Sequence, residues 1–539
     1  MKKALLQIML VFSLITLNAQ DFTYGDLEYM INDDDITVTL MGHIDGYDAS
    51  GTLNIPTTVY YYGDAYTVTI IDDFAFNYCT GLTGALVIPN TVEEIGDDAF
   101  SHCGFTGVVT IPASVEYIGY TPFYDCNGIE GFVVDPNNED YDSRDNCNAI
   151  ISSYNNELIV GCKNSFIPNT IESIGEDAFN HCEGLTSITI PNSVTFIGGY
   201  AFWFTGLTSI TIPSSVGLIG VNPFGGCAAL TEIVVESGNP EYDSRSGCNA
   251  IIKTEWNEMI SGCQNTVIPN SVTRIGSNAF YYCTALSGEL VIPEQITSIE
   301  EYAFEGCSGL TGSLVIPNSV NQLGESAFAN CGFNGTLTLS ESLPNIQDWT
   351  FEGCQGFTGS LVIPNSVRTI GTSAFEDCRG FNGSLTLPER LASIGSFAFA
   401  SCSNFTEAVT LAEAPPTLGS YPFAGFGSTT LTVPCGCVSA YENSAWHEQF
   451  TTISQDCEAI SEEQSFEARV YPNPTQGRLT IEAENIKCIG IYNLIGEKVF
   501  ECTVNADAVE VDLDGFIKGL YLIRIATANG ILTKKLTVM

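Results

Sequence analysis

The stretch LTSITIPNSVTFIGGYAF, residues 185–202, is one copy of a phrase that recurs along most of the chain. It opens with the alternation of a short strand, which directs Ile188 and Ile190 inward and Thr189 outward. Pro191 ends the strand because it has no N–H to give to a sheet ladder. The residues expected to turn back into the core are Val194, Ile197, Ala201 and Phe202.

The phenylalanine that closes each copy returns at a nearly fixed interval. Neighbouring copies are 22 to 24 residues apart, except at two gaps of 56 residues. This period predicts a solenoid, because a unit of this size cannot bury its own apolar face and must stack on its neighbours. The phenylalanines are Phe76, Phe100, Phe123, Phe179, Phe202, Phe224, Phe280, Phe304, Phe328, Phe351, Phe375, Phe399 and Phe423.

The chain is strongly acidic, with a formal charge of −45, and the acidity is unevenly distributed. Residues 21–468 hold 55 Asp and Glu against 8 Lys and Arg, whereas residues 469–539 hold 8 of each class. Such a surface repels nucleic acid and anionic lipid, both of which are bound through basic side chains. The charge excludes nucleic acid as a partner and keeps a long β-rich protein soluble.

The first residues indicate export. Met1, Lys2 and Lys3 precede an apolar run over 4–17 and a small-residue site that ends at Ala19. This is the pattern of a secretory signal peptide, for which we expect residues 1–19 to be removed. No later stretch approaches the roughly 20 apolar residues that a membrane span needs.

Other segments set the expected domains. Each 56-residue gap holds one longer coil, near 128–170 and near 229–271. The segment YDSR at 141–144 of the first recurs at 242–245 in the second, an offset of 101 residues. Alternating residues over 20–70 predict a β cap for the first coil. We expect the solenoid to cover 71–457, and the acidic stretch 458–468 to be a linker.

The repeated phrase resembles leucine-rich repeats, and more narrowly the BspA-like subfamily of secreted bacterial and protozoan surface proteins. The resemblance covers about residues 50 to 435. It implies a β-rich leucine-rich-repeat solenoid with short strands and little helix. It also implies adhesion to proteins or glycans of a host or of neighbouring cell surfaces.

The last 71 residues have a different composition. Short alternating strands separated by Gly, Asn and Pro turns over 469–539 predict a small C-terminal β-sandwich. The sequence YPNP at 471–474, the Asn493-Gly496-Val499 centre, Gly519-Leu520-Tyr521 and the basic final strand resemble the type IX secretion sorting domain of Bacteroidetes. The resemblance implies the type IX machinery as a partner, with release or attachment at the outer surface.

Twenty cysteines suggest a disulfide scaffold or a metal site, but most of them follow the repeat. Eleven lie three residues after the repeat phenylalanine, where stacked coils make a column of small apolar residues, and we interpret them as core packing. Better disulfide candidates are Cys147 with Cys162, Cys248 with Cys263, and either Cys435 or Cys437 with Cys457. No pair has the C-x-x-C spacing of a zinc site.

Two further patterns resemble functional sites, one a His-Cys pair and the other a calcium loop. His102 and His181 each precede a column cysteine, but the same slot elsewhere varies freely, so we interpret it as surface. The acidic run over 135–142 offers oxygen ligands for calcium but lacks the glycine of a calcium loop, which favours a solvated turn. We therefore predict no catalytic residue, no metal and no cofactor.

The outward residue of successive strands is nearly always Thr or Val, which makes a flat uncharged ladder. Its simplest origin is the β-propensity of an exposed strand, and the functional alternative is an extended contact surface for a protein or a glycan. The candidate residues are Thr110, Thr189, Thr211, Thr338 and Thr386, with Val87, Val291, Val315 and Val362 between them.

These observations favour a secreted or surface-attached interaction protein, with adhesion as its role. A structural component of a surface layer or matrix, without a specific ligand, is the alternative. A secreted hydrolase is less favoured, because catalysis needs a convergent, non-repeating set of polar groups and the sequence has neither G-x-S-x-G nor H-E-x-x-H.

Overall fold

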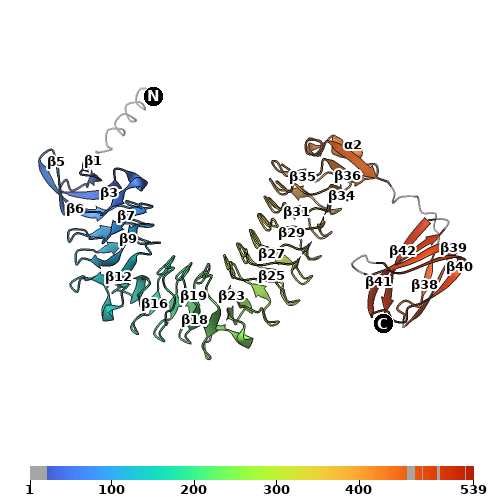
Figure 1. The fold of residues 1–539 in the computed structure, drawn as a ribbon, viewed down its shortest axis with the longest axis horizontal. Helices are drawn as coiled ribbons and strands as arrows, with labels where there is room; N and C mark the ends of the chain where they lie inside the picture. Colours follow the sequence, from blue (N-terminus) through green and yellow to red (C-terminus); the bar gives the residue numbers. More distant parts are fainter. Residues whose placement is uncertain (1–20, 458–467, 476, 494–497, 528–529) are drawn as a thin grey trace, which may run out of the picture. The chain divides into compact units, whose positions relative to one another are not determined.

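The computed structural model describes residues 21–457, 468–475, 477–493, 498–527 and 530–539. The predicted signal peptide, 1–19, and nearly all of the predicted linker, 458–468, lie outside these residues. The chain forms two compact units, Met1–Gln455 and Asp456–Met539. Figure 1 shows the first as a stack of coils and the second as a sheet of longer strands.

An antiparallel cap begins the first unit and continues into the solenoid. Strands β1, β2 and β3 pair in antiparallel order, then β3 and β6 pair in parallel, and β6 pairs in parallel with β8 of the next coil. The cap therefore covers the first coil through ordinary sheet hydrogen bonds. Its elements are β1 (Asp21–Tyr24), β2 (Leu27–Ile31), β3 (Thr37–His43), η1 (Gly46–Asp48), β5 (Thr58–Tyr61) and β6 (Asp64–Ile71).

Each regular coil has three faces, and the first carries two-residue strands that pair in parallel, in four groups along the unit. Every strand pairs with its counterpart one coil away, and its second residue is an inward Ile or Leu. The strands are β8 (Glu94–Ile95), β11 (Tyr117–Ile118), β16 (Ser173–Ile174), β17 (Phe196–Ile197), β19 (Leu218–Ile219), β24 (Arg274–Ile275), β25 (Ser298–Ile299), β27 (Gln322–Leu323), β29 (Asn345–Ile346), β31 (Thr369–Ile370), β33 (Ser393–Ile394) and β35 (Thr417–Leu418).

The second face carries the strands that precede the repeat proline. These strands pair in parallel but in separate groups, so this sheet is interrupted along the unit. They are β4 (Ser50–Gly51), β7 (Gly81–Gly84), β9 (Gly104–Phe105), β10 (Gly107–Ile111), β12 (Ile129–Val134), β18 (Ser209–Ile212), β20 (Glu232–Val235), β26 (Leu314–Val315), β28 (Leu337–Thr338), β30 (Leu361–Val362), β32 (Ser384–Leu387), β34 (Glu407–Thr410), β36 (Thr430–Pro434) and β37 (Thr452–Asp456).

The third face, which we call the turn face, contains the repeat phenylalanine. Backbone N–H groups of one coil donate to carbonyls of the next, as Phe280 does to Ala303 and Phe304 to Ala327, both at 2.8 Å. The residues two positions before and two positions after the phenylalanine have positive φ, for example Asn278 and Tyr282 around Phe280. The backbone polar groups of this face are thus used between coils.

The repeat phenylalanines form the central column of the core. The ring of Phe328 is fully buried and lies parallel to the rings of Phe304 and Phe351, with centroids 5.2 and 5.8 Å apart. The same stacking joins Phe375, Phe399 and their neighbours. The repeat is therefore a packing rule, in which each coil buries its ring against the next.

The two long coils insert antiparallel strands into the first sheet. In each, a short meander ends in a strand that pairs in parallel with the following coil, as β15 does with β16 and β23 with β24. The extra segments thus extend the solenoid sheet. They are β13 (Tyr141–Asp142), η2 (Arg144–Asn146), β14 (Ile150–Ser152) and β15 (Glu157–Val160), then β21 (Tyr242–Asp243), η3 (Arg245–Gly247), β22 (Ala250–Lys253) and β23 (Glu258–Gly262).

A helical turn closes the last coil. Helices α2 (Val438–Glu442) and η4 (Ala445–Glu448) place Trp446 on the terminal ring of the column, Phe423, and Tyr441 against the Trp446 ring. Both covering side chains are almost completely buried, and the indole Nε1 of Trp446 donates to the carbonyl of Pro416 at 2.8 Å. This turn caps the apolar end of the stack.

The described residues of the second unit form five strands that pair in one antiparallel sheet, and the predicted small β-sandwich stays a prediction. The long strand β39 pairs with β40 along one edge and with both β38 and β41 along the other, and β42 pairs with β41. Register shifts within β39 allow the sheet to bend around its core. The strands are β38 (Arg469–Tyr471), β39 (Arg478–Tyr492), β40 (Lys498–Asp512), β41 (Gly519–Thr527) and β42 (Gly530–Val538).

Candidate interaction surfaces

The predicted contact ladder lies on the second face, and its members differ in setting. Thr110, Thr211 and Thr338 are exposed residues of β10, β18 and β28. Thr386 of β32 is half-buried, and Thr189 is exposed but belongs to no strand. The ladder is therefore present in groups of neighbouring coils, with an irregular stretch at Thr189.

Strand register decides which ladder residues are neighbours. Thr110 lies opposite Val133, Thr211 opposite Val234, Val315 opposite Thr338, and Val362 opposite Thr386. Valines of this ladder are well exposed, with Val315 at 54% and Val362 at 59%. The surface alternates methyl and hydroxyl groups without a charge, within a unit that is otherwise strongly acidic.

The cysteine column is part of the core. Most column thiols donate to the carbonyl of a repeat phenylalanine one coil back, as Cys331 does to Phe304 and Cys378 to Phe351, at 3.0 and 3.1 Å. Burial raises the pKa of these two thiols well above its usual value. A thiol held neutral in this way is not a nucleophile, so the column is structural.

The two disulfides predicted in the long coils are not formed. Cys147, Cys162, Cys248 and Cys263 are all free thiols in the structure. The reason is packing, because Cys147 lies in the apolar cluster of the coils that follow it, whereas Cys162 lies in the cluster of the coils that precede it. The Cys162 thiol donates to the backbone carbonyl of Asn148 at 3.4 Å instead.

At the end of the solenoid the structure selects one of the two candidate pairings. Cys435 and Cys457 are disulfide-bonded, and because every other cysteine of the chain is free, they are bonded to each other. Cys437 is a free thiol at the start of α2. The bond joins the beginning of the capping turn to the end of the last strand, β37.

Loss of this disulfide should destabilise the C-terminal coil. The bond closes a loop between positions 22 residues apart, so replacing Cys435 and Cys457 by serine should cost about 3 kcal/mol through the larger entropy of the unfolded chain. Chemical denaturation of the full chain measures this change. Cys437→Ser is the matched control and should change stability by under about 0.5 kcal/mol, and a similar loss in both variants would contradict the prediction.

The side chains of His102 and Cys103, which are adjacent in the sequence, point in different directions. His102 Nδ1 lies 2.9 Å from Asp125 Oδ2, and its ring stacks on Tyr78. The thiol of Cys103 points inward and donates to the Phe76 carbonyl at 3.1 Å. The two side chains therefore do not act on a common atom.

The polar side chains of the acidic turn over 135–142 form hydrogen bonds within the fold. Asp135 Oδ1 accepts the N–H of Asn137 at 2.9 Å, and the Asn138 amide donates to the carbonyls of Pro112 and Val115. In its duplicate, Asn239 makes the same bonds to the preceding coil. Among the residues that the structure describes, no group of three acidic, His or Cys side chains is arranged to hold a metal.

The repeated Tyr-Asp-Ser-Arg segment braces the long coils. The Tyr141 hydroxyl accepts the N–H of Ile118 at 3.0 Å, and Arg144 donates to Asp142 and to Asn156. Tyr242 and Arg245 repeat these bonds in the second long coil. The identity of the two segments is thus accounted for by internal hydrogen bonding.

One set of residues on the turn face was missed by the sequence reasoning. Aromatic and histidine rings from successive coils contact one another there, and the contacts continue across both long coils, from Tyr124 to His181 and from Phe204 to Tyr282, with centroids 4.9 and 6.0 Å apart. The sequence feature that could have revealed this set is the frequency of Tyr, His, Phe and Trp at the two positions after the repeat phenylalanine. We call this set the aromatic track: Tyr78, His102, Tyr124, His181, Phe204 and Tyr282.

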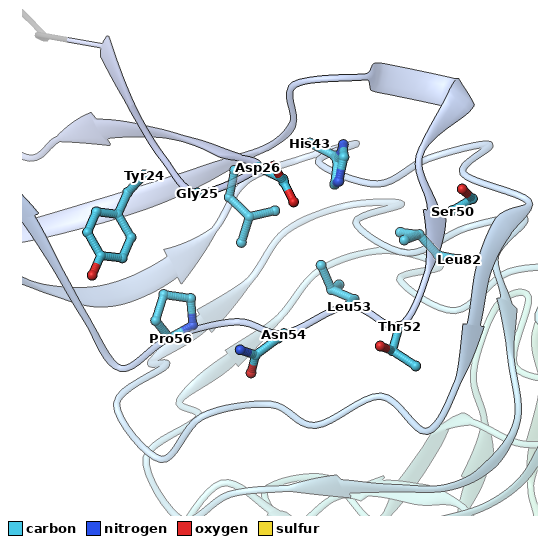
Figure 2. A pocket seen from close by; sticks show the side chains of 11 residues that line it. Tyr24, Gly25, Asp26, His43, Ser50, Thr52, Leu53, Asn54, Pro56 and Leu82 are labelled. Carbon is cyan, nitrogen blue, oxygen red and sulfur yellow. The ribbon is translucent and has the colours of Figure 1, made fainter.

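A hollow of ≈ 300 Å³ lies where the cap meets the first coils, and Figure 2 shows the side chains around it. Leu27, Leu53 and Leu82 give it an apolar side, and polar groups such as Asp26 and His43 lie at its rim. No hydrogen bond joins the Asp26 and His43 side chains, both of which the structure describes. His43 Nδ1 lies 3.6 Å from Asp45 Oδ2 instead. The hollow is at the small end of the range for ligand sites.

Comparison with known families identifies the repeats. The model of the BspA type leucine rich repeat region matches residues 65–148, 150–254, 250–382 and 381–467, which is most of the chain. The chain belongs to the BspA-type leucine-rich repeat family. The model of the secretion system C-terminal sorting domain matches residues 469–539. The two matches confirm the predicted repeat family and the predicted sorting domain.

Solved structures of similar proteins include two bacterial leucine-rich repeat proteins. A leucine-rich cell surface protein of Faecalibacterium prausnitzii is 25% identical, with 73% of this chain and 95% of that chain covered and a TM-score of 0.43. A leucine-rich repeat protein of Bacteroides ovatus is 23% identical, with 81% and 100% covered and a TM-score of 0.37. A further relative is ulvan lyase NLR42 of Nonlabens ulvanivorans, 36% identical over 91 residues, and this chain spans 16% of its length.

The BspA-type protein is a cell-surface or secreted protein. Its sorting domain indicates type IX export to the cell surface or to the medium. Within the described part of the chain, no helix is long and apolar enough to cross a membrane. The repeat family also favours a non-enzymatic role for the solenoid.

Proposed function

We propose that this BspA-type protein is an adhesion protein, whose solenoid attaches to proteins or glycans of a host or of neighbouring cells. The observation that carries the proposal is the exposed ladder on the second face. Within each group of paired coils it offers methyl and hydroxyl groups at regular spacing, where one strand follows another every ~4.8 Å. Exposed apolar surface of this regularity is typical of interaction sites.

The charge pattern supports the same function. The solenoid is acidic overall, while Val315, Thr338 and Val362 are uncharged, so a partner can contact these ladder residues with little desolvation of charge. Export by the type IX route brings this surface to other cells. The long and regular face of a solenoid also allows many weak contacts to act together.

Arginine on the ladder should abolish attachment without unfolding the protein. Val315 and Thr338 lie opposite each other and are exposed, so V315R with T338R should reduce binding to the ligand at least 10-fold while stability changes by under about 1 kcal/mol. The full chain is assayed against immobilised collagen, fibronectin, mucin and cell-wall glycans, followed by thermal denaturation.

Gln322→Arg is the matched control, because Gln322 is exposed on the first face of the same part of the solenoid. It should leave binding unchanged. Failure of the unmodified protein to bind any ligand of the panel at micromolar concentration would refute the proposed function, and self-assembly in the absence of a ligand would favour a structural matrix component.

A further inference from the structure

Each coil has two left-handed positions on the turn face, and only the one after the repeat phenylalanine is filled differently in the two halves of the solenoid. The position before it carries rings in the later coils as well, at Tyr302, Trp349, Phe397 and Tyr421. The position two residues after the repeat phenylalanine has positive φ throughout, with 58° at His102, 51° at Phe204 and 56° at Asn330. Gly, Asn and Asp adopt this conformation readily, and bulky side chains are disfavoured there. The later coils follow this preference with Gly306, Asn330, Gly353, Asp377, Ser401 and Gly425.

The earlier coils place ring side chains at most of these positions. Tyr78, His102, His181, Phe204 and Tyr282 are ring side chains at the same left-handed position. Histidine is tolerated in this conformation, so Tyr78, Phe204 and Tyr282 are the residues that break the preference, where Gly or Asn would serve folding alone. Residues that break a local backbone preference in a systematic way are a known mark of functional surfaces.

Polar groups accompany the rings of the aromatic track. Asp125 accepts hydrogen bonds from His102 and from Asn127, at 2.9 and 2.7 Å. Beside the His181 ring, a hollow of ≈ 30 Å³ is lined by Asp125, Asn127 and Asn180 among others. This hollow is large enough for a water molecule or a hydroxyl group.

We propose that the aromatic track binds a single chain of an uncharged polysaccharide, lying along the solenoid axis. A sugar ring has an apolar C–H face and a rim of hydroxyl groups. These match the solvent-facing parts of the half-buried rings and the Asp125, Asn127 and Asn180 side chains beside His102 and His181. The rings continue from coil to coil, so a polymer engages several of them at once and gains affinity by multivalency.

Other occupants fit the track less well. The acidic charge of the solenoid disfavours polyanionic glycans and a second copy of the chain. An extended peptide gains much of its affinity by adding to a sheet edge, and the backbone groups of this face are already bonded between coils, as at Phe280 and Phe304. Burial also lowers the pKa of His181 below its usual value, which keeps this ring neutral.

The inference deepens the proposed function by naming a ligand class and a surface separate from the ladder. To test it, the full chain is sedimented with insoluble cellulose, xylan and curdlan, and with alginate beads as the polyanionic comparison. We expect retention by at least one neutral polymer and none by alginate. F204N with Y282N should weaken binding at least 10-fold with an unchanged or higher melting temperature, because asparagine suits the left-handed positions.

Tyr421→Asn is the matched control, since Tyr421 is an exposed left-handed aromatic residue of the turn face that lies outside the track. It should change binding less than twofold, and the conservative variants F204Y and Y282F should retain binding. If the double variant fails to fold, Tyr78→Asn replaces it, because Tyr78 is 53% exposed.

Three results would each overturn the inference. The first is that no neutral polymer retains the protein, and the second is that F204N with Y282N binds as well as the unmodified protein. The third is that Tyr421→Asn loses as much binding as F204N with Y282N. Each is distinct from failure of the proposed function. A protein that binds another ligand through the ladder, but no neutral polysaccharide, keeps the proposed function and refutes only the aromatic track.

Discussion

Replacing Phe328 by alanine should lower the free energy of unfolding of the solenoid by about 3–5 kcal/mol. The ring is fully buried and stacks between the rings of Phe304 and Phe351, so truncation removes contacts with both neighbouring coils. The surrounding column cannot close the cavity, because each ring is held by its own coil. Urea denaturation followed by circular dichroism measures the change.

The position of Phe328 near the middle of the later coils adds a second expectation. In a repeat array each coil is coupled only to its neighbours, so a weakened interface in the interior separates two groups of coils. The denaturation curve should broaden or divide into two transitions. The control is Val315→Ala on the exposed ladder, which should change stability by no more than about 0.5 kcal/mol. Equal effects of both substitutions would contradict the packing role of the column.

Much of the coil could be predicted from its periodicity. Val194, Ile197, Ala201 and Phe202 were expected in the core, and all four are fully buried. Ile188 was expected inward with Ile190 but is only half-buried. The physical reason is local, because residues 185–190 follow a long coil and form no strand there, so the alternation of a regular strand does not apply.

The aromatic track could not be predicted from sequence periodicity alone. The contact between Tyr124 and His181 joins residues on either side of a 56-residue gap, and it requires that the coils before and after the long coil remain adjacent on the turn face. Left-handed backbone geometry at Tyr78, Phe204 and Tyr282 is likewise invisible in the residue types, since bulky aromatic residues favour other conformations. The adjacency of these coils and their backbone conformation are both seen only in the stacked coils of the structure.

The cysteines show a similar limit of sequence reasoning. Their column position predicted burial, which the structure has, but not that thiols such as Cys331 bond to a carbonyl of the preceding coil. Equal spacing suggested disulfides between Cys147 and Cys162 and between Cys248 and Cys263. Spacing does not reveal which apolar cluster each side chain enters, and the members of each pair enter different clusters.

Replacing Trp446 by alanine should cost about 3–5 kcal/mol as well, but at the end of the stack. The indole is 1% exposed, packs on Phe423 and Phe450, and donates its N–H to the Pro416 carbonyl. Its removal leaves that carbonyl without the indole donor and opens the apolar end of the phenylalanine column to water. Hydrogen exchange should rise in the last coils, and light scattering should detect association through the exposed end.

The two truncations distinguish a cap from an interior interface. An end coil has one neighbour, so loss of Trp446 should fray the last coils while the earlier coils keep their melting temperature, whereas loss of Phe328 weakens coupling on both sides. His447→Ala is the control for the cap, because His447 is exposed beside the buried indole and should have no measurable effect. Exchange that rises uniformly through the first unit in W446A would mean that the solenoid unfolds as one cooperative body, and nearest-neighbour coupling would then be the wrong description of its stability.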